Sequence, residues 1–199
     1  MKQSLAKTIL SLVGWKVEGT IPLSLKKCIV VMAPHTSNWD FVLGWLGYSK
    51  LGLKSKYLIK KEAFRFPLGA LVRKLGGIPV DRKRSNHVLS EISLMIRQSD
   101  EMILTVTPEG TRSLNRHWKR GFYYLAQQAN VPLALGFLDY KTKTGGIGPI
   151  VEVTGDFKKD MEIIEAFYRD KTARYPEKFN LSPQYFPNGK EDSEKFEII

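Results

Sequence analysis

The sequence predicts an α/β fold, namely a single layered domain with a largely parallel central sheet flanked by helices. Short runs rich in β-branched residues, such as residues 27–33 and 102–106, indicate strands that are buried on both faces. Amphipathic stretches of ten or more residues lie between the runs, and helices of that length typically connect parallel strands. A chain of 199 residues is long enough for one such domain with a sizeable core.

The first sixteen residues are expected to form an amphipathic helix. Four apolar residues recur with helical spacing, and they are Leu5, Ile9, Leu12 and Val13. Three lysines surround them, and they are Lys2, Lys7 and Lys16. Such a helix can insert its apolar stripe at the surface of an anionic membrane, or it can pack the stripe on the protein's own sheet. Both interpretations stay open, and residues 17–199 are assigned to the α/β domain.

The remaining elements alternate between strands and helices. We predict strands at residues 27–33, 57–59, 78–80, 102–106, 132–138 and near 149–153. We predict helices at residues 40–53, 62–75, around 88–96, 118–128 and 158–174. In the helix around residue 90, the side chains expected to face the core are Val88, Ile92, Met95 and Ile96. The tail after about residue 175 contains three prolines and an Asn-Gly pair, which favours irregular structure.

Charge and composition limit the classes of function. The chain has 31 Lys and Arg against 20 Asp and Glu, a net charge of +11. Such a charge favours anionic partners: nucleic acid, acidic lipid headgroups, phosphorylated small molecules or an acidic carrier protein. With Cys28 as the only cysteine and three scattered histidines, we expect no internal disulfide and no metal site. No apolar run approaches the ~18–20 residues that span a bilayer, and Lys7 interrupts any secretory signal, so a cytoplasmic protein is expected.

Two polar turns each follow a buried strand, at residues 34–40 and 107–113. In sheets of this kind ligands bind beyond the carboxyl ends of the strands, so both turns lie where an active site is expected. The chain contains no GxSxG elbow, and Cys28 lies inside a predicted strand, so no protein nucleophile is predicted. A base in these turns would deprotonate a hydroxyl of the substrate instead.

His35 and Asp40 are the candidate catalytic pair. On a continuous helix their spacing of five would leave the side chains roughly 140° apart, so they meet only if the chain turns between them. Pro34 disfavours helix before it and Ser37 is a good N-cap, which supplies that turn. Asp40 would then hold one imidazole nitrogen and leave the other as a general base. Alternatively, Ser37 and Asp40 form only a capping box at the helix start.

Four blocks resemble the motifs of a known family. Residues 35–40 resemble HxxxxD, residues 77–82 resemble the second block, which ends in an arginine, and residues 108–113 resemble FPEGTRS. Residues 131–136 are similar to the fourth block, VPxxP. Two residues depart from the family pattern, and they are Thr107 in place of Phe and Gly136 in place of the second proline. On these motifs the chain resembles the glycerolipid acyltransferases, typified by 1-acylglycerol-3-phosphate acyltransferase, and residues 17–199 would be the acyltransferase domain.

The resemblance implies a reaction and a set of site residues. A fatty acyl group would pass from an acyl-carrier-protein or coenzyme A thioester to a hydroxyl of a lysolipid, above all 1-acylglycerol-3-phosphate, in phospholipid synthesis. It implies that His35 is the general base and that Asp40 orients it, with no metal or redox cofactor. The residues that would hold the acceptor, commonly through its phosphate, are Arg82, Glu109, Gly110, Thr111 and Arg112. Arginine side chains suit this role, since a guanidinium group matches two phosphate oxygens.

Several alternatives stay open. The acceptor can be a lysolipid without phosphate, the protein can be a non-catalytic relative that binds anionic lipid, or water can replace the acceptor in a thioester hydrolase. Nucleic acid is not the expected partner, because the positive charges are dispersed and no basic helix or zinc finger is present. The expected partners are the lysolipid, the thioester donor and an anionic membrane surface. The expected location is peripheral, at the cytoplasmic face of the cell membrane.

Overall fold

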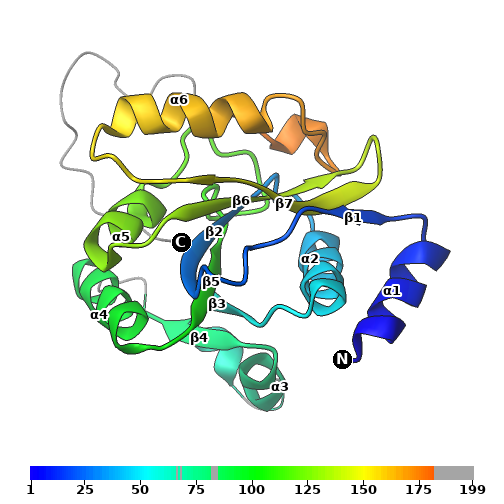
Figure 1. Ribbon diagram of the computed structural model, residues 1–199, viewed down its shortest axis with the longest axis horizontal. Helices are drawn as coiled ribbons and strands as arrows, with labels where there is room; N and C mark the ends of the chain where they lie inside the picture. The colour runs from blue at the N-terminus through cyan, green and yellow to red at the C-terminus, as the bar shows by residue number, and fades with distance from the viewer. Residues whose placement is uncertain (66, 68, 82–84, 182–199) are drawn as a thin grey trace.

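A seven-stranded sheet crosses the middle of the protein in this computed structural model, with helices on both faces (Figure 1). The structure describes residues 1–65, 67, 69–81 and 85–181, of which residues 85–87 by their backbone alone. The order of strands across the sheet is β1-β7-β6-β2-β5-β3-β4. The strands are β1 (Lys16–Glu18), β2 (Lys27–Ala33), β3 (Ser55–Lys60), β4 (Gly77–Val80), β5 (Met102–Val106), β6 (Leu133–Asp139) and β7 (Thr144–Val151).

Helices connect most of these strands. The α-helices are α1 (Gln3–Leu12), α2 (Asn38–Leu51), α3 (Gly69–Lys74), α4 (Ser85–Gln98), α5 (Gly121–Ala129) and α6 (Phe157–Tyr168). Two short 3-10 helices are also present, η1 (Lys61–Phe64) and η3 (Pro176–Lys178). Every neighbouring pair of strands runs parallel except β6 and β7, which form a hairpin because only residues 140–143 separate them. The predicted fold class is therefore confirmed.

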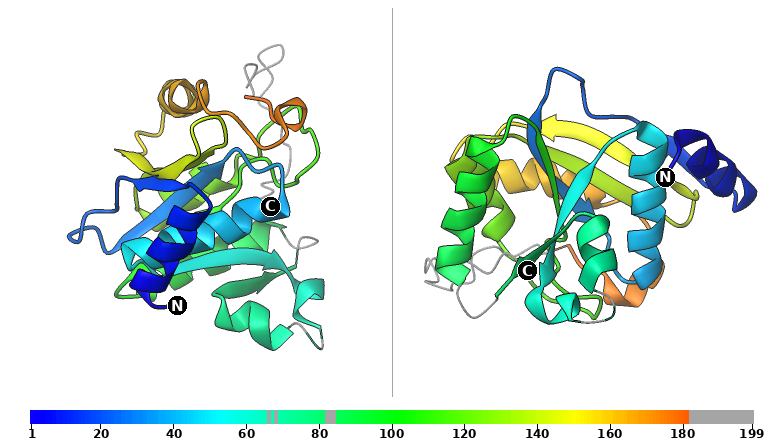
Figure 2. Two further views of the ribbon diagram at one scale, coloured as in Figure 1. Left: turned by 90° about the vertical axis from the view of Figure 1, so that its right-hand side faces the viewer. Right: turned by 90° about the horizontal axis from the view of Figure 1, so that it is seen from below.

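Alternate residues of β2 build the two halves of the core. Ile29 and Val31 belong to a cluster with apolar side chains of α4, α5 and α6. Val30 and Met32 point to the other face, where they join side chains of α1 and α2. Figure 2 shows these groups of helices on either side of the twisted sheet. β2 is buried throughout this span because both of its faces are covered, as its continuous apolar sequence predicted.

The predicted helix at residues 62–75 is wrong, because the segment contains η1 and the separate helix α3. Pro67 disfavours helical backbone in the residue before it. Gly69, at the start of α3, lies so close to η1 that an added Cβ would be 2.0 Å from the carbonyl oxygen of Phe64.

Other boundaries and faces also differ from the sequence-based predictions. The three-residue strand β1 was not predicted, and α6 ends at Tyr168, well before residue 174. Helix α5 begins at Gly121, because Trp118 lies buried in the preceding loop with its indole N–H donating to the carbonyl of Asn180 at 3.0 Å. Met95 does not face the core and is 40% exposed. The predicted Ile92 and Ile96 are buried, and Leu89 and Ser93 are buried beside them.

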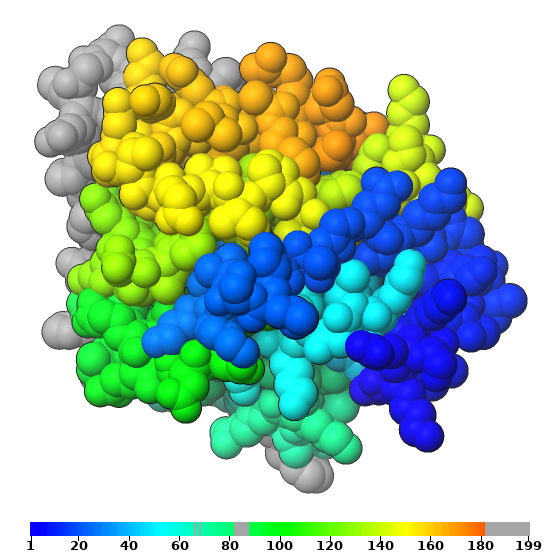
Figure 3. All heavy atoms as spheres, viewed as in Figure 1, coloured from blue at the N-terminus to red at the C-terminus, as the bar shows by residue number. Residues whose placement is uncertain are grey.

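Helix α1 packs beside α2 and turns most of its predicted apolar stripe to solvent. Its buried side chains are Ala6 and Leu10, which join the cluster beneath α2. Of the four stripe residues only Ile9 is half-buried, while the exposed ones are Leu5 at 52%, Leu12 at 82% and Val13 at 49%. Figure 3 shows this N-terminal segment projecting from one side of the molecule. Among the described residues, no helix combines the length and apolar character that crossing a membrane requires.

Candidate active site

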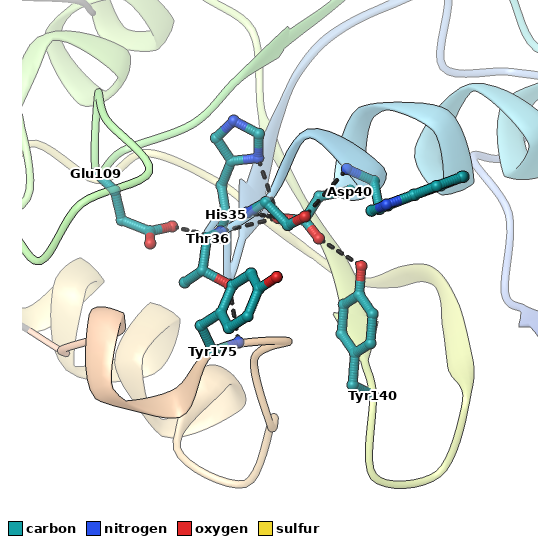
Figure 4. Close-up of polar contacts among 8 residues, drawn as sticks. His35, Thr36, Asp40, Glu109, Tyr140 and Tyr175 are labelled. Atoms are coloured by element: carbon teal, nitrogen blue, oxygen red, sulfur yellow. Dashed lines mark hydrogen bonds and ion pairs between the residues drawn. The ribbon is translucent and has the colours of Figure 1, made fainter.

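The two polar turns meet at the carboxyl ends of β2 and β5, because these two strands are parallel neighbours. Val106, the last residue of β5, pairs with Val31, two residues before the end of β2, so the turns that follow the two strands lie side by side. The backbone N–H of His35, after β2, donates to Glu109 Oε1, after β5, at 2.8 Å (Figure 4). The edge predicted to hold a site therefore brings together the first and third sequence blocks.

Hydrogen bonds among residues 36–40 hold the turn that links His35 to the first turn of α2. Ser37 Oγ accepts from the Trp39 amide at 3.2 Å, and Asp40 Oδ2 accepts from the Thr36 and Ser37 amides at 2.8 and 2.7 Å. The same Oδ2 lies 3.4 Å from His35 Nδ1. Asp40 thus both caps the helix and faces the imidazole, so the capping role does not exclude a contact with His35. A slightly long contact is common for a catalytic pair without bound substrate.

Asp40 is buried and stays ionised because donors surround it. Burial alone would raise the pKa of its carboxyl, but hydrogen bonds from His35, Tyr140 and the Ser37 amide outweigh burial and hold the pKa below its usual value. The side chain of His35 is 17% exposed, while that of Asp40 is 2% exposed. The Asp40 carboxylate is therefore fixed and buried, while the His35 imidazole remains partly exposed to solvent.

Glu109 approaches the His35 turn from the opposite direction and is only 3% exposed. Burial raises the pKa of its carboxyl to about 8, the negative charge of Asp40 adds to the rise, and the hydrogen bond from His35 opposes it. No described residue bonds to its second oxygen, Oε2. A carboxyl with these properties is mostly protonated at neutral pH, so it holds the His35 backbone without adding a second full negative charge beside Asp40.

Glu109→Gln should make the free energy of unfolding less dependent on pH. The folded protein keeps the Glu109 proton up to about pH 8 although the ordinary pKa is 4.5, so wild-type stability should fall as the pH rises between these values. Each pH unit in that range should lower the free energy of unfolding by up to about 1.4 kcal/mol. Glutamine is neutral and keeps the oxygen that accepts from His35. Urea unfolding across that pH range checks the slope, with the exposed Glu162→Gln as the matched control. Identical slopes for wild type and Glu109→Gln would contradict this account.

The other acceptor-binding candidates have different positions. Gly110 has a φ of 65°, a left-handed conformation that glycine adopts without strain, and it turns the chain directly after Glu109. Thr111 and Arg112 follow on the exposed side of this turn, and Thr111 Oγ1 accepts from the Ser113 amide at 3.2 Å. Within the described part of the chain, Arg112 forms no ion pair. Arg82, the fifth candidate, lies outside the described residues.

The sequence model of the acyltransferase family matches residues 14–134, more than half of the chain. The chain belongs to the acyltransferase family. The resemblance found in the four sequence blocks is confirmed at this level, and the matched region includes both polar turns.

A solved structure resembles this acyltransferase in fold. It is the crystal structure of the 1-acyl-sn-glycerophosphate (LPA) acyltransferase PlsC from Thermotoga maritima, with a TM-score of 0.61 and 19% sequence identity. The similarity covers 87% of this chain and 79% of that chain. No curated protein matches this acyltransferase in sequence. At such low identity, the likeness to PlsC shows a common fold.

Three residues beside the turn that holds His35 and Asp40 were not predicted from the sequence. Tyr140, in the turn between β6 and β7, donates its hydroxyl to Asp40 Oδ1 at 2.6 Å. The amide of Tyr175 donates to Thr36 Oγ1 at 3.2 Å, and the Arg174 guanidinium lies 5.7 Å from the centre of the Trp39 ring. All three come from beyond the region that the acyltransferase family matches. Among the described residues, no cluster of His, Cys, Asp and Glu could hold a metal ion.

Proposed function

We propose that this acyltransferase moves a fatty acyl group from an acyl-carrier-protein or coenzyme A thioester to the hydroxyl of 1-acylglycerol-3-phosphate, in phospholipid synthesis. The observation that carries the proposal is the His35–Asp40 contact beside the turn that holds Arg112. Both belong to the region matched by the acyltransferase family. Neither turn supplies a serine in a nucleophile elbow, which favours direct transfer to the substrate hydroxyl.

In the proposed mechanism His35 is the general base. Its Nδ1 faces Asp40, which favours the tautomer with the proton on Nδ1 and leaves Nε2 free to accept a proton. Nε2 removes the proton of the acceptor hydroxyl while that oxygen attacks the thioester carbonyl. The tetrahedral intermediate then expels the thiolate, which takes the proton from the imidazolium. The new ester and the free thiol leave, and His35 returns to its starting state.

The turn after β5 supports the proposal that the acceptor carries a phosphate. Arg112 is exposed close to the His35 turn, and its fork of N–H donors can bind two phosphate oxygens. Thr111 adds a hydroxyl, and the chain's net charge of +11 attracts an anionic substrate. We assign Arg82 to the same group on the strength of its sequence block. Glu109 would support this site by accepting the hydrogen bond from the backbone N–H of His35.

A small apolar cavity, partly open to solvent, supports a place for part of the fatty acyl chain. It lies between α1, α2 and the β6–β7 hairpin, and its lining includes Met32, Leu43, Gly44, Gly47, Leu138 and Ile147. Leu43 stands one helical turn after Asp40, so the cavity begins near the catalytic pair. A Cβ added at Gly44 or Gly47 would have no other atom within 4 Å, so the lack of a side chain at these glycines leaves open space in the cavity.

The exposed stripe on α1 supports peripheral binding at the anionic, cytoplasmic face of a membrane. Leu5 and Leu12 point away from the protein, and lysines flank the helix. Leucine side chains inserted in the interface and lysines near acidic headgroups act together in such helices. Ala6 and Leu10 hold the other side of α1 against the core, so the helix should stay folded when it binds.

The double substitution Leu5→Ser and Leu12→Ser should weaken sedimentation with anionic vesicles by at least about tenfold, because burial of one leucine is worth about 1.5–3 kcal/mol. The protein should remain folded, since both side chains are exposed. Leu94→Ser is the matched control, because Leu94 is 47% exposed on α4, away from α1. Added salt should weaken binding of the wild-type chain as well. Equal binding by the double variant and wild type would exclude α1 as the membrane contact.

A panel of lysolipid acceptors with both thioester donors tests the proposed reaction, with the products read by mass spectrometry. We expect the acylated phosphate-bearing lysolipid as the main product. Preference for a neutral lysolipid would contradict the acceptor assignment but keep the acyl transfer. Release of free fatty acid from the thioester, with no acylated lipid, would identify a hydrolase instead.

A further inference from the structure

Tyr140 contacts Asp40 on the side away from the imidazole. Asp40 Oδ2 is occupied by the Thr36 and Ser37 amides and faces His35. Its other oxygen, Oδ1, accepts from the Tyr140 hydroxyl at 2.6 Å, much closer than the 3.4 Å between Oδ2 and the imidazole. Figure 4 shows Tyr140 and His35 approaching Asp40 from different sides. Because both oxygens are engaged, the carboxylate cannot rotate freely about its Cβ–Cγ bond.

The neighbourhood of Tyr140 fixes the position of its hydroxyl. The ring packs edge-on against Trp15, with centroids 5.0 Å apart, and the Tyr140 amide donates to the carbonyl of Thr172 at 2.9 Å. The Thr172 amide in turn donates to Asp139 Oδ1 at 3.2 Å. These contacts join the β6–β7 turn to the segment after α6. The hydroxyl therefore belongs to a rigid part of the structure.

The charged groups around the hydroxyl keep it a hydrogen-bond donor. Asp40 and Arg174 contact Tyr140 directly, while His35 and Glu109 lie on the far side of Asp40. Burial raises the pKa of the Tyr140 hydroxyl, and its hydrogen bond to the negative Asp40 raises the pKa further, while Arg174 opposes the rise. The hydroxyl consequently keeps its proton at neutral pH and donates to Asp40.

We propose that Tyr140 is a positioning residue for acyl transfer, which holds the Asp40 carboxylate turned so that Oδ2 faces His35 Nδ1. The proposal rests on the proposed role of His35 and Asp40, and it assigns a role to a residue beyond the region that the family matches. Tyr140 acts through Asp40 and does not touch the reacting atoms.

Loss of this hydroxyl should have two consequences. Asp40 Oδ1 would lose a short donor in a buried place, which destabilises the ionised form and raises the pKa of the Asp40 carboxyl. The carboxylate would also be held through Oδ2 alone, by the Thr36 and Ser37 amides, so its orientation toward the imidazole, and with it the tautomer of His35, would be less firmly fixed. The first consequence affects activity at acid pH, and the second lowers kcat at every pH.

Tyr140→Phe tests the proposal, because phenylalanine keeps the ring that packs on Trp15. We expect kcat to fall about tenfold with unchanged KM, since one hydrogen bond to a charged group is lost. The acid limb of the kcat/KM profile should fall more steeply, because the Asp40 carboxyl takes up a proton more readily than in wild type. Tyr123→Phe is the matched control, because the Tyr123 hydroxyl donates to buried Asp160 Oδ2 at 2.8 Å, remote from His35. The control should lose thermal stability without a change in pH profile.

Nitrogen NMR of the imidazole provides a readout that does not depend on acyl transfer. In wild type the two ring nitrogens of His35 should show the tautomer with the proton on Nδ1, and Tyr140→Phe should increase the other tautomer. The signals of His117 should stay the same in both proteins. If the tautomer ratio of His35 and the acid limb are both unchanged in Tyr140→Phe, the positioning role is wrong. If no acyl transfer occurs in wild type while the tautomer still changes, only the proposed reaction fails.

Discussion

Replacing His35 with alanine is expected to lower kcat by about 10²–10⁴-fold, the usual contribution of a positioned general base. The protein should remain folded, because the side chain lies in a turn at the sheet edge and belongs to neither core cluster. The backbone N–H that donates to Glu109 is kept in the variant. Steady-state kinetics with a lysolipid and a thioester, beside a thermal melt, check both statements.

Asp40→Asn should also lose most of the activity, but for two reasons that need separation. The amide no longer stabilises an imidazolium, and it also replaces the carboxylate that accepts from the Thr36 and Ser37 amides at the start of α2. Asp156→Asn is the matched control for the second effect. Asp156 is the N-cap of α6 and accepts from the Lys159 amide at 3.1 Å. Both variants should lose up to about 1 kcal/mol of stability, while only Asp40→Asn should lose activity.

Full activity in a folded His35→Ala protein would exclude His35 as the base. Equal activity losses in Asp40→Asn and Asp156→Asn would show that helix capping, and not the imidazole contact, makes Asp40 important. A reduced but pH-independent activity in His35→Ala would mean that donor and acceptor positioning contribute the remainder of the rate enhancement.

The sequence was sufficient where structure depends on consecutive residues. The continuous apolar run of β2 predicted a strand covered on both faces, and the parallel pairing with β5 then placed two distant turns together. The helix predicted at residues 62–75 failed for a local reason that the sequence did contain, since Pro67 and Gly69 interrupt it. β1 has only three residues and is partly exposed, so it forms because β7 offers a free edge and not because of its own pattern.

Periodicity predicted amphipathic helices better than it predicted their buried faces. In α4, Ile92 and Ile96 lie one turn apart, and either Met95 or Ser93 could lie beside them on the buried face. In the structure Ser93 is buried and Met95 is exposed. In α1 the sequence left open whether the larger apolar side chains pack on the protein or face a membrane. The structure places Ala6 against α2, because a small side chain lets two helices approach closely.

Part of the candidate active site had no local signature in the sequence. His35, Asp40 and Glu109 lie within recognisable blocks, but Tyr140 is 100 residues from Asp40 in the sequence. A single tyrosine at the end of a strand is most often an ordinary surface or core residue. Its contact depends on how the β6–β7 hairpin and the segment after α6 pack on the turn that holds His35 and Asp40, which only the three-dimensional structure reveals.

Arg112→Ala should lower kcat/KM for a phosphate-bearing lysolipid by about ten- to a hundredfold, because a charged hydrogen bond is worth about 1.5–3 kcal/mol. The loss with a neutral lysolipid should be much smaller. Arg112 is exposed on the turn after Glu109, so its removal leaves the core intact. Arg112→Lys should restore only part of the activity, since a point charge cannot reproduce the planar fork of donors. Arg82→Ala should behave in the same way if both arginines bind one phosphate.

Arg97→Ala is the matched control for the loss of one positive charge. Arg97 lies at the opposite end of the sheet, where its carbonyl accepts from Lys27 at the start of β2, and its own guanidinium donates to the carbonyl of Gln128. This variant should keep the preference for the charged lysolipid. Equal losses of Arg112→Ala with charged and neutral acceptors would contradict phosphate binding. If those losses appeared only with the coenzyme A thioester and not with the acyl-carrier-protein thioester, Arg112 would instead bind the phosphates of the donor.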